Sequence, residues 1–424
     1  MSINLRKTIL SLTCIFAFLA SFDQVLELYG IDTIFKPSRV AAIFILIVSF
    51  FYQYPRWKII YFQPDKCWIF MIIWGITMTL LKFFLGIKIS LFNLFNDGSQ
   101  VLFLIFVYLA IKRIEMTTRE MLRVFAYYAI GVCLNNALVI LNYYILQTSS
   151  RAEGLMENSN WAAFSIGIAI LYFIFRLSEN RFSLWKASTW FYMTLVIYLI
   201  MGVIATGSRT GVFVTGLCIP LMALLSADIG TKFRGLVFMV IVFPFMLMFS
   251  PVREFIANNI YATLTENSAV GRLKNTSDDI RLYLWRAGWN SVEDNFGTGL
   301  GIGQFRSISN YKKYMLPVGP DFYYGREVRD TNGGIGLHSL YIQILVDYGV
   351  VPLLALLFFF YKVLIMRIVD LFTSNEKATS YMSFVIMVAV LLTSITGQGL
   401  MGGVFWVVML IISHVPPRHE KISA

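Results

Sequence analysis

Apolar residues occur along the chain in long, continuous runs. Each run covers about 15–22 residues, the length that a helix needs to cross a hydrocarbon core about 30 Å thick. No run alternates between apolar and polar positions, so the pattern predicts membrane helices and not the strands of a barrel. Twelve spans are predicted, over residues 8–22, 38–53, 67–85, 98–111, 124–146, 161–176, 188–205, 211–226, 235–251, 339–361, 379–396 and 399–413.

One segment interrupts this pattern. From Pro251 to about Gly336, polar residues dominate for longer than in any other connection, and loops of that length in compact proteins are usually functional or disordered. We therefore predict an all-α polytopic membrane protein with a large external loop between its ninth and tenth helices. Its predicted parts are transmembrane helices 1–9 in residues 1–251, a loop with short amphipathic helices in residues 252–338, and helices 10–12 with a tail in residues 339–424.

The loop contains a helix signal of its own. Thr276 or Ser277 can cap a helix, and two aspartates follow in its first turn. Ile280, Leu284 and Ala287 then share one face, as expected of an amphipathic helix. The sequence therefore predicts ordered structure within the loop.

Composition and charge agree with this organisation. Hydrophobic residues make up 58% of the chain and charged residues 14%, whereas a soluble domain has roughly 25% charged residues. If the N-terminus is cytoplasmic, about 19 lysines and arginines fall at cytoplasmic connections and about 6 at the short external ones. Because cytoplasmic loops carry the excess of basic residues, we expect both termini in the cytoplasm and the long loop outside.

This asymmetry accounts for most of the net charge of +11. The long loop holds nearly equal numbers of acidic and basic residues, so no nucleic-acid-binding face is expected. No spacing of His, Asp or Glu suggests a metal site. The four cysteines form no C-x-x-C pair, and we expect them as small buried residues in or beside spans. They are Cys14, Cys67, Cys133 and Cys218.

His338 ends the long loop and is the only histidine predicted on the external face, because His414 and His419 lie in the cytoplasmic tail. Imidazole has an ordinary pKa near neutrality, so His338 is the candidate general base of that face. The alternative is a polar residue at a helix start that solvent satisfies. Its position at the membrane boundary, where the aqueous phase meets lipid, favours the catalytic role.

Four arginines are predicted on the same face. Arg281 and Arg286 lie on the loop helix, Arg209 lies in the turn 206–211, and Arg151 lies between the fifth and sixth spans. An arginine at a bilayer edge can be a snorkelling anchor. The planar guanidinium also suits phosphate oxygens, and the set as a whole favours a phosphate or pyrophosphate ligand.

The glycine run 297–303 resembles a nucleotide-binding loop only superficially, because no Lys-Ser/Thr pair follows it. Tight backbone turns are predicted there instead. Charged residues in the middle of spans are nearly absent, which argues against an ion-coupled carrier. Asp347, in the tenth predicted span, is the main exception. A helix-packing hydrogen bond and a catalytic role are both open for it.

Taken together, these segments resemble the O-antigen polymerase and O-antigen ligase superfamily of bacterial inner-membrane glycosyltransferases. That family has a histidine motif of the form H-N/S-x-Y/F-L-x-x-x-x-E/D-x-G. The matching positions are His338, Ser339, Tyr341, Asp347 and Gly349, with Ile342 in place of the leucine.

Three other elements carry the resemblance. The arginine of the family's loop helix matches Arg281, and its T/S-x-S-R-T/A-x turn matches residues 206–211, which include Arg209. The family element R-x-x-G-x-x-x-N-P-N corresponds to residues 151–160, where Ser159 stands in place of the proline. The expected twelve spans and the large loop are also similar to the family's topology.

The resemblance implies a mechanism. A glycan on undecaprenyl pyrophosphate would be the donor, and Arg281, Arg209, Arg286 and Arg151 would bind the pyrophosphate, with Arg281 and Arg209 leading. His338 would take the proton of an acceptor hydroxyl, which attacks the anomeric carbon with inversion. Neither a cofactor nor a metal is implied. The active site is expected on the periplasmic face of a multi-pass protein of the inner membrane, in contact with membrane lipid.

Two functions in the family share this site. A polymerase uses a second lipid-linked repeat unit as acceptor, and a ligase uses lipid A–core. An aromatic-rich loop favours the polymerase slightly, and the ligase stays open; a chain-length regulator as a partner also stays open. The loop aromatics are Tyr311, Tyr314, Phe322, Tyr323 and Tyr324. A flippase for the same lipid-linked sugars is a further alternative, disfavoured by the one-sided loop, and a scaffold role leaves His338 and the arginines unexplained.

Overall fold

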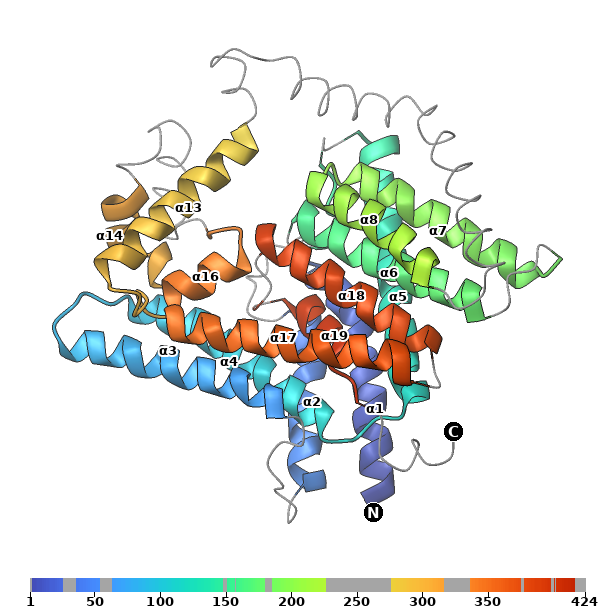
Figure 1. Ribbon diagram of the computed structural model, residues 1–424, viewed down its shortest axis with the longest axis horizontal. Helices are drawn as coiled ribbons and strands as arrows, with labels where there is room; N and C mark the ends of the chain where they lie inside the picture. Colours follow the sequence, from blue (N-terminus) through green and yellow to red (C-terminus); the bar gives the residue numbers. More distant parts are fainter. Residues whose placement is uncertain are drawn as a thin grey trace.

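The computed structural model describes residues 2–25, 36–53, 63–147, 151–156, 158–179, 185–225, 276–315, 336–374, 377–397, 400 and 402–415. Within this part of the chain every regular element is a helix, as the apolar runs predict (Figure 1). The ninth predicted span, residues 235–251, lies outside the described residues, and so do residues 252–275 and 316–335 of the loop.

Eight of the described helices are long and apolar enough to cross a membrane, which confirms a multi-pass membrane protein; the number twelve stays a prediction. The first eight predicted spans correspond to α1 (Ser2–Leu19), α2 (Pro37–Gln53), α3 (Lys66–Phe84), α4 (Leu91–Lys112), α5 (Thr118–Ile140), α6 (Ser159–Glu179), α7 (Ala187–Ala205) and α8 (Arg209–Leu225). The later helices are α13 (Thr276–Asp294), α14 (Ile308–Asn310), α16 (Leu340–Asp347), α17 (Val350–Thr373), α18 (Lys377–Thr396) and α19 (Gly403–Ile412).

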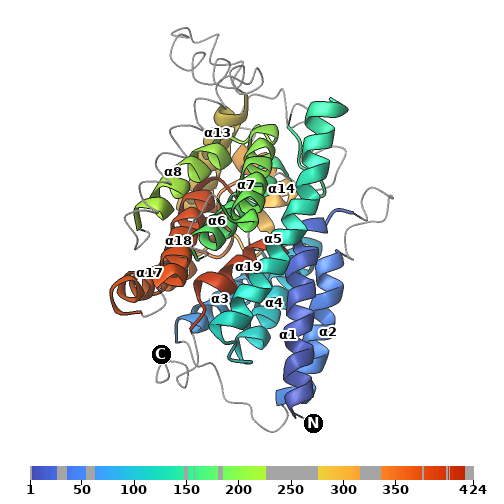
Figure 2. The same cartoon turned by 90° about the vertical axis from the view of Figure 1, so that its right-hand side faces the viewer.

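The long helices form a bundle around α6 and α19. The pair α1 and α2 packs beside α5, α6 packs against α7 and α8, and α17 lies between α3 and α18 (Figures 1 and 2). All ten residues of α19 are buried. At about 1.5 Å per residue this helix is about 15 Å long, half the thickness of a hydrocarbon core. The run 399–413 is therefore a short central helix in the structure and not the full-length span that the sequence predicts.

The tenth predicted span was also wrong in its extent. The apolar run 339–361 contains two helices, because α16 ends at Asp347 and α17 begins at Val350. Gly349 lies between them with φ +100° and ψ 179°, a conformation that is essentially restricted to glycine. The membrane-crossing helix at this point is α17, which runs on to Thr373.

The glycine run 297–303 closes this break. The N–H groups of Leu300 and Gly301 donate to the carbonyls of Val346 and Asp347 at the end of α16, at 2.7 and 3.0 Å. The N–H of Val350, at the start of α17, donates to the carbonyl of Gly297 at 2.8 Å. Backbone groups that a helix end leaves without intrahelical partners are thereby satisfied. The tight turns predicted for the run are confirmed by positive φ angles at its four glycines.

The helix predicted in the loop is confirmed as α13, which packs against α16. Its closest approach is at Gly288, where a Cβ atom would lie 3.1 Å from side-chain atoms of both Leu337 and Val346. Leu284 and Ala287 are buried in this contact. The loop therefore has a small apolar core of its own, which holds it on the segment that carries His338.

Replacing Gly349 by alanine is expected to destabilise the protein. An alanine there would carry a backbone conformation that costs about 1–3 kcal/mol, and its Cβ would lie 2.7 Å from the carbonyl oxygen of Gly297. The midpoint of thermal unfolding of purified protein in detergent measures the effect. Gly86→Ala is the matched control, because Gly86 also has a positive φ but no heavy atom lies within 4 Å of an added Cβ. Equal midpoints for the two variants would contradict the role assigned to the close contact.

Candidate functional site

His338 lies directly before α16, in the turn that leads into the helix. Ser339 is the N-cap of α16, and its hydroxyl accepts a hydrogen bond from the N–H of Ile342 at 3.5 Å. His338 itself has a φ of +50°, which is uncommon for a residue other than glycine. Such conformations persist where the surrounding structure holds them, and they concentrate at functional sites.

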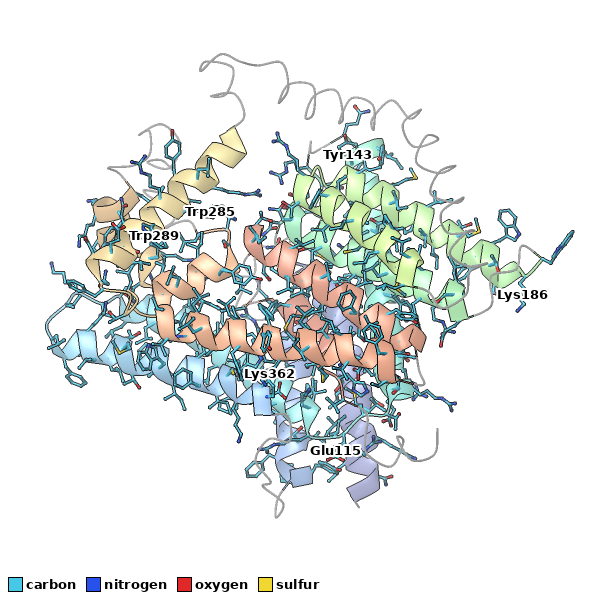
Figure 3. The ribbon with its side chains drawn as sticks, viewed as in Figure 1. Glu115, Tyr143, Lys186, Trp285, Trp289 and Lys362 are labelled. Carbon is cyan, nitrogen blue, oxygen red and sulfur yellow. The ribbon has the colours of Figure 1, made fainter. Side chains whose placement is uncertain are left out.

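The loop helix α13 is docked beside this turn. Trp285 lies on α13 (Figure 3). It donates from its indole N–H to the carbonyl of Leu337, the residue before His338, at 3.1 Å. Arg281 is four residues earlier on α13, and residues four apart share one face of a helix. The docking of Trp285 therefore brings Arg281 over the histidine.

Three arginines act on His338. Burial is the largest cause that lowers the pKa of His338, and the positive charges of Arg281, Arg306 and Arg151 add to it in that order, so that the pKa is about 4. These arginines come from α13, from the 3-10 turn Gln304–Arg306 and from the segment after α5. His338 is therefore uncharged at neutral pH, in surroundings that are strongly positive.

Arg151 is linked to a second sequence motif through Asn160. The side-chain carbonyl of Asn160 accepts from the guanidinium of Arg151 at 3.4 Å and from the hydroxyl of Ser208 at 2.8 Å. Ser208 also accepts from the N–H of Gly211 at 3.1 Å, in the first turn of α8. The element 151–160 and the turn 206–211, which are far apart in the sequence, thus meet at one amide.

Ser159 stands where the family has proline, and the contacts of Asn160 with Arg151 and Ser208, which we call the Asn160 corner, form with serine at this position. Asn158 caps α6, because its side-chain oxygen accepts from the N–H groups of Asn160 and Trp161 at 3.1 and 3.0 Å. Gly154 has a positive φ, and a Cβ atom on it would lie 2.5 Å from the side-chain oxygen of Asn135. The glycine of the motif is therefore required by a close contact with α5.

The other two predicted arginines lie differently. Arg209 is the first residue of α8, directly after Ser208, and so adjoins the corner that holds Arg151. Arg286 is exposed on α13. Five residues separate it from Arg281, which places it about 140° around the helix from that side chain. The structure thus gathers Arg281 and Arg151 at His338, keeps Arg209 next to their corner, and leaves Arg286 on another face.

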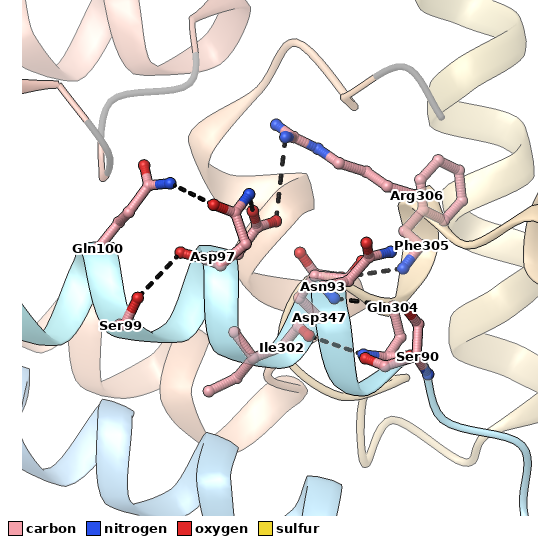
Figure 4. A network of polar contacts seen from close by, with 12 residues as sticks. Ser90, Asn93, Asp97, Ser99, Gln100, Ile302, Gln304, Phe305, Arg306 and Asp347 are labelled. Carbon is pink, nitrogen blue, oxygen red and sulfur yellow. Dashed lines mark hydrogen bonds and ion pairs between the residues drawn. The ribbon is translucent and has the colours of Figure 1, made fainter. Parts of the chain in front are cut away.

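Arg306 is the arginine that sequence reasoning missed. Its guanidinium lies 3.9 Å from a carboxylate oxygen of Asp97 on α4 (Figure 4). In the sequence the only signal for Arg306 is its position just after the glycine run. The sequence does not show that this run is hydrogen-bonded to the end of α16.

Asp347 supports the same turn. It is buried at the end of α16, and its carboxylate accepts from the N–H of Phe305 at 3.4 Å. Burial, together with the negative charge of Asp97, raises the pKa of Asp347 to about 7, and the positive charge of Arg306 opposes that rise. The observed contact favours the packing role for Asp347, which fixes the turn that carries Arg306.

These features define a class: a multi-pass helical membrane protein in which a neutral histidine lies among arginines at the end of a docked loop helix. The model of the O-antigen ligase family, Wzy_C, matches residues 193–358. Residues 193–358 therefore carry the Wzy_C domain, which O-antigen polymerases and ligases share. That domain implies a glycan-transferring membrane enzyme of polysaccharide assembly. The matched range includes Arg209, Arg281, Arg306 and His338. No curated protein sequence matches the chain.

The electrostatics of the site give a first test. In Arg281→Gln the pKa of His338 is expected to rise from about 4, because one of the three positive charges that disfavour the imidazolium is gone. Histidine NMR of purified protein measures it, since the chain has three histidines and His338→Gln identifies the signal. Lys313→Gln is the control, because Lys313 is an exposed loop cation paired with Asp294 at 2.7 Å. An ordinary pKa near 6.5 that Arg281→Gln leaves unchanged would refute this description.

Proposed function

We propose that this protein transfers a glycan from undecaprenyl pyrophosphate to an acceptor hydroxyl on the periplasmic face of the bacterial inner membrane. The acceptor in this proposal is a second lipid-linked repeat unit, so the protein is a surface-polysaccharide polymerase. The observation that carries the proposal is the convergence of Arg281, Arg306 and Arg151 on an uncharged His338. Such a site offers a proton acceptor and a binding place for phosphate oxygens side by side.

In the proposed reaction His338 accepts a proton and the arginines stabilise the leaving group. The acceptor hydroxyl attacks the anomeric carbon, the bond from that carbon to the pyrophosphate oxygen breaks, and the hydroxyl proton passes to the imidazole of His338. The electron pair of the broken bond leaves with the pyrophosphate. Arginines next to that oxygen, led by Arg281 and by Arg209 beside the Asn160 corner, stabilise the developing negative charge. Attack opposite to the leaving group inverts the configuration of the sugar.

Donor binding makes His338 a stronger base in this scheme. Burial and the arginines together lower the pKa of His338 to about 4, which keeps it unprotonated but weakly basic. A bound pyrophosphate brings at least two negative charges, which offset those of the arginines and favour the imidazolium. The pKa of His338 then rises toward the range in which general bases are effective. The histidine is thus activated only when a donor is present.

The arrangement of the chain supports the periplasmic location. The loop helix α13 and the N-terminal end of α1 lie at opposite ends of the molecule in both views (Figures 1 and 2). The excess of basic residues assigns the N-terminus to the cytoplasm. The site next to α13 is then on the outer face, where lipid-linked glycans are expected after their export.

The ligase is the second candidate, and the description of the matched family favours it.

The loop aromatics support the polymerase over the ligase less strongly than the sequence suggests. Tyr314 is buried and lies in hydrogen-bond contact with Asn295 and Lys313, so it packs the loop and does not offer a face to a sugar. The aromatic residues 322–324 lie outside the described residues.

His338→Ala is expected to abolish transfer and leave a folded, membrane-inserted protein. Loss of a general base lowers rates about 10²–10⁴-fold. The measurement is transfer by purified protein in lipid nanodiscs, with a polyprenyl-pyrophosphate oligosaccharide as donor. The thermal unfolding midpoint of the same sample controls for folding, and full activity in the variant would sink the general-base role.

A strain that lacks this chain distinguishes the two candidates. Lipid A–core that carries one repeat unit, with no ladder, is the outcome expected of a missing polymerase. Bare core with long polymer accumulating on the lipid carrier would identify a ligase and overturn the choice made here. The measurement is the surface-polysaccharide profile together with the extracted lipid-linked intermediates, and a normal ladder would contradict both functions.

A further inference from the structure

We propose that Arg306 is an additional residue that binds the pyrophosphate of the donor, and that Asp97 on α4 is the positioning residue that holds it. This inference rests on the proposed function for the identity of the ligand. It assigns the 3-10 turn Gln304–Arg306 to the site, although neither the histidine motif nor the loop-helix arginine includes it.

Arg306 and Asp97 differ sharply in accessibility. The side chain of Asp97 is 4% exposed and that of Arg306 is 30% exposed, with 3.9 Å between the nearest guanidinium nitrogen and carboxylate oxygen. The carboxylate is therefore enclosed in the protein, whereas the arginine side chain keeps part of its surface accessible. A guanidinium carries five N–H donors in a planar fork, so it can contact a carboxylate on one edge and phosphate oxygens on another.

Asp97 is itself held firmly. Its Oδ1 accepts from the side-chain amide of Asn96 at 3.2 Å, and Asn96 in turn accepts from the amide of Gln100 at 2.8 Å (Figure 4). The backbone of the glycine run passes close to the same carboxylate, because a Cβ atom on Gly303 would lie 2.7 Å from its Oδ2. The chain passes this close to Asp97 only because residue 303 is glycine.

The turn with Arg306 is held near His338 by contacts of its two preceding residues, Gln304 and Phe305. Phe305 is buried in the same apolar cluster as Leu337, the neighbour of His338. The carboxylate of Asp347 accepts from the N–H of Phe305, which fixes the turn on α16. Gln304 donates from its side chain to the carbonyl of Ser90 at 3.0 Å and so fixes it on the start of α4. The position of Arg306 is thus determined by α4 and α16 together.

The alternative is that Arg306 only compensates the buried charge of Asp97. Removing one partner of such a pair leaves an uncompensated charge and destabilises the fold. Arg306→Gln alone therefore cannot separate the two roles. The double variant Arg306→Gln/Asp97→Asn removes both charges, so no uncompensated charge is left buried and the fold is expected to be retained under either role.

The first experiment measures binding of inorganic pyrophosphate to the purified full-length protein by calorimetry, which requires no transfer activity. Arg306→Gln and the double variant are both expected to bind about 10- to 100-fold more weakly than the native protein, as for lost hydrogen bonds to a charged ligand. Arg306→Lys recovers only part of the affinity, because lysine keeps the charge but not the fork. Lys313→Gln, which removes a paired cation of the same loop, leaves the affinity unchanged.

Native affinity in the double variant would overturn the proposal, since Arg306 would then serve only to balance Asp97. An equal loss in Lys313→Gln would overturn it as well, because the effect would be one of general charge. The transfer assay supplies the second readout. With a repeat unit that lacks the lipid pyrophosphate as acceptor, the KM for the donor is expected to rise in the double variant and the KM for this acceptor to stay unchanged. A rise confined to the acceptor would refute donor binding. Since calorimetry is independent of transfer, failure of the proposed function and failure of this inference give different results.

Discussion

The hydrogen bonds between the glycine run 297–303 and the break after α16 are the constraint on which the rest of the site depends. They satisfy the last carbonyls of α16 and the first N–H of α17, groups that would be costly to leave buried and unpaired. The same short segment leads directly into the turn with Arg306. One contact therefore fixes both the helix that begins after His338 and the turn that faces it, and the positive-φ glycines are what let the two backbones approach.

The second constraint is electrostatic. Arg281, Arg306 and Arg151 repel one another, and burial disfavours a charge on His338. The protein keeps this arrangement through anchors that lie outside the positive cluster: Trp285 bonded to the backbone of Leu337, Asn160 bonded to Arg151, and Asp97 paired with Arg306. Arg151 and Arg306 are thus tied to a neutral group on α6 and an acidic group on α4, and Arg281 is placed by the docking of its own helix. The groups that hold the arginines therefore come from several separate elements of the fold.

Much of the fold follows from the lengths of the apolar runs alone, because a run of about 20 apolar residues in a membrane is expected to form a spanning helix. The errors occur where the run is continuous but the backbone is not. Around Gly349 the run 339–361 stays apolar on both sides, so hydropathy predicts one helix, although Gly349 and Pro352 are signals of a helix end. The break is held by a partner segment about 50 residues earlier. The run 399–413 reads as a span by hydropathy, although its helix is short and wholly buried. Hydropathy reports an apolar environment but does not distinguish lipid from protein.

For the site, residue chemistry predicts His338 and the arginines Arg281, Arg151, Arg209 and Arg286. The structure brings the first two of these arginines to the histidine and leaves Arg286 on another face of α13. Arg306 and Asp97 could not be found in this way, because their relation is created by tertiary contacts between α4 and the loop. Asp97 reads in the sequence as a polar residue near the start of a span, and Arg306 as one of several loop cations. The close approach of Gly303 to Asp97 brings Arg306 next to that carboxylate, and this contact is visible only in the folded protein.

The dispersal of the arginines along the sequence has an energetic consequence. The cations on α13 and on the turn after the glycine run meet Arg151 only when the loop is docked on α16, and that docking is driven by an apolar cluster, since the charges oppose it. The cluster includes Leu284, Ala287, Phe305, Leu337 and Val346. In the proposed function, a pyrophosphate bound between the arginines would remove the opposing repulsion and would therefore favour the docked loop. By linkage, the docked loop must bind the anion more tightly than an undocked one. Assembly of the site and binding of its ligand are thus two sides of one equilibrium, in which apolar burial supplies the geometry and the anion supplies the missing charge.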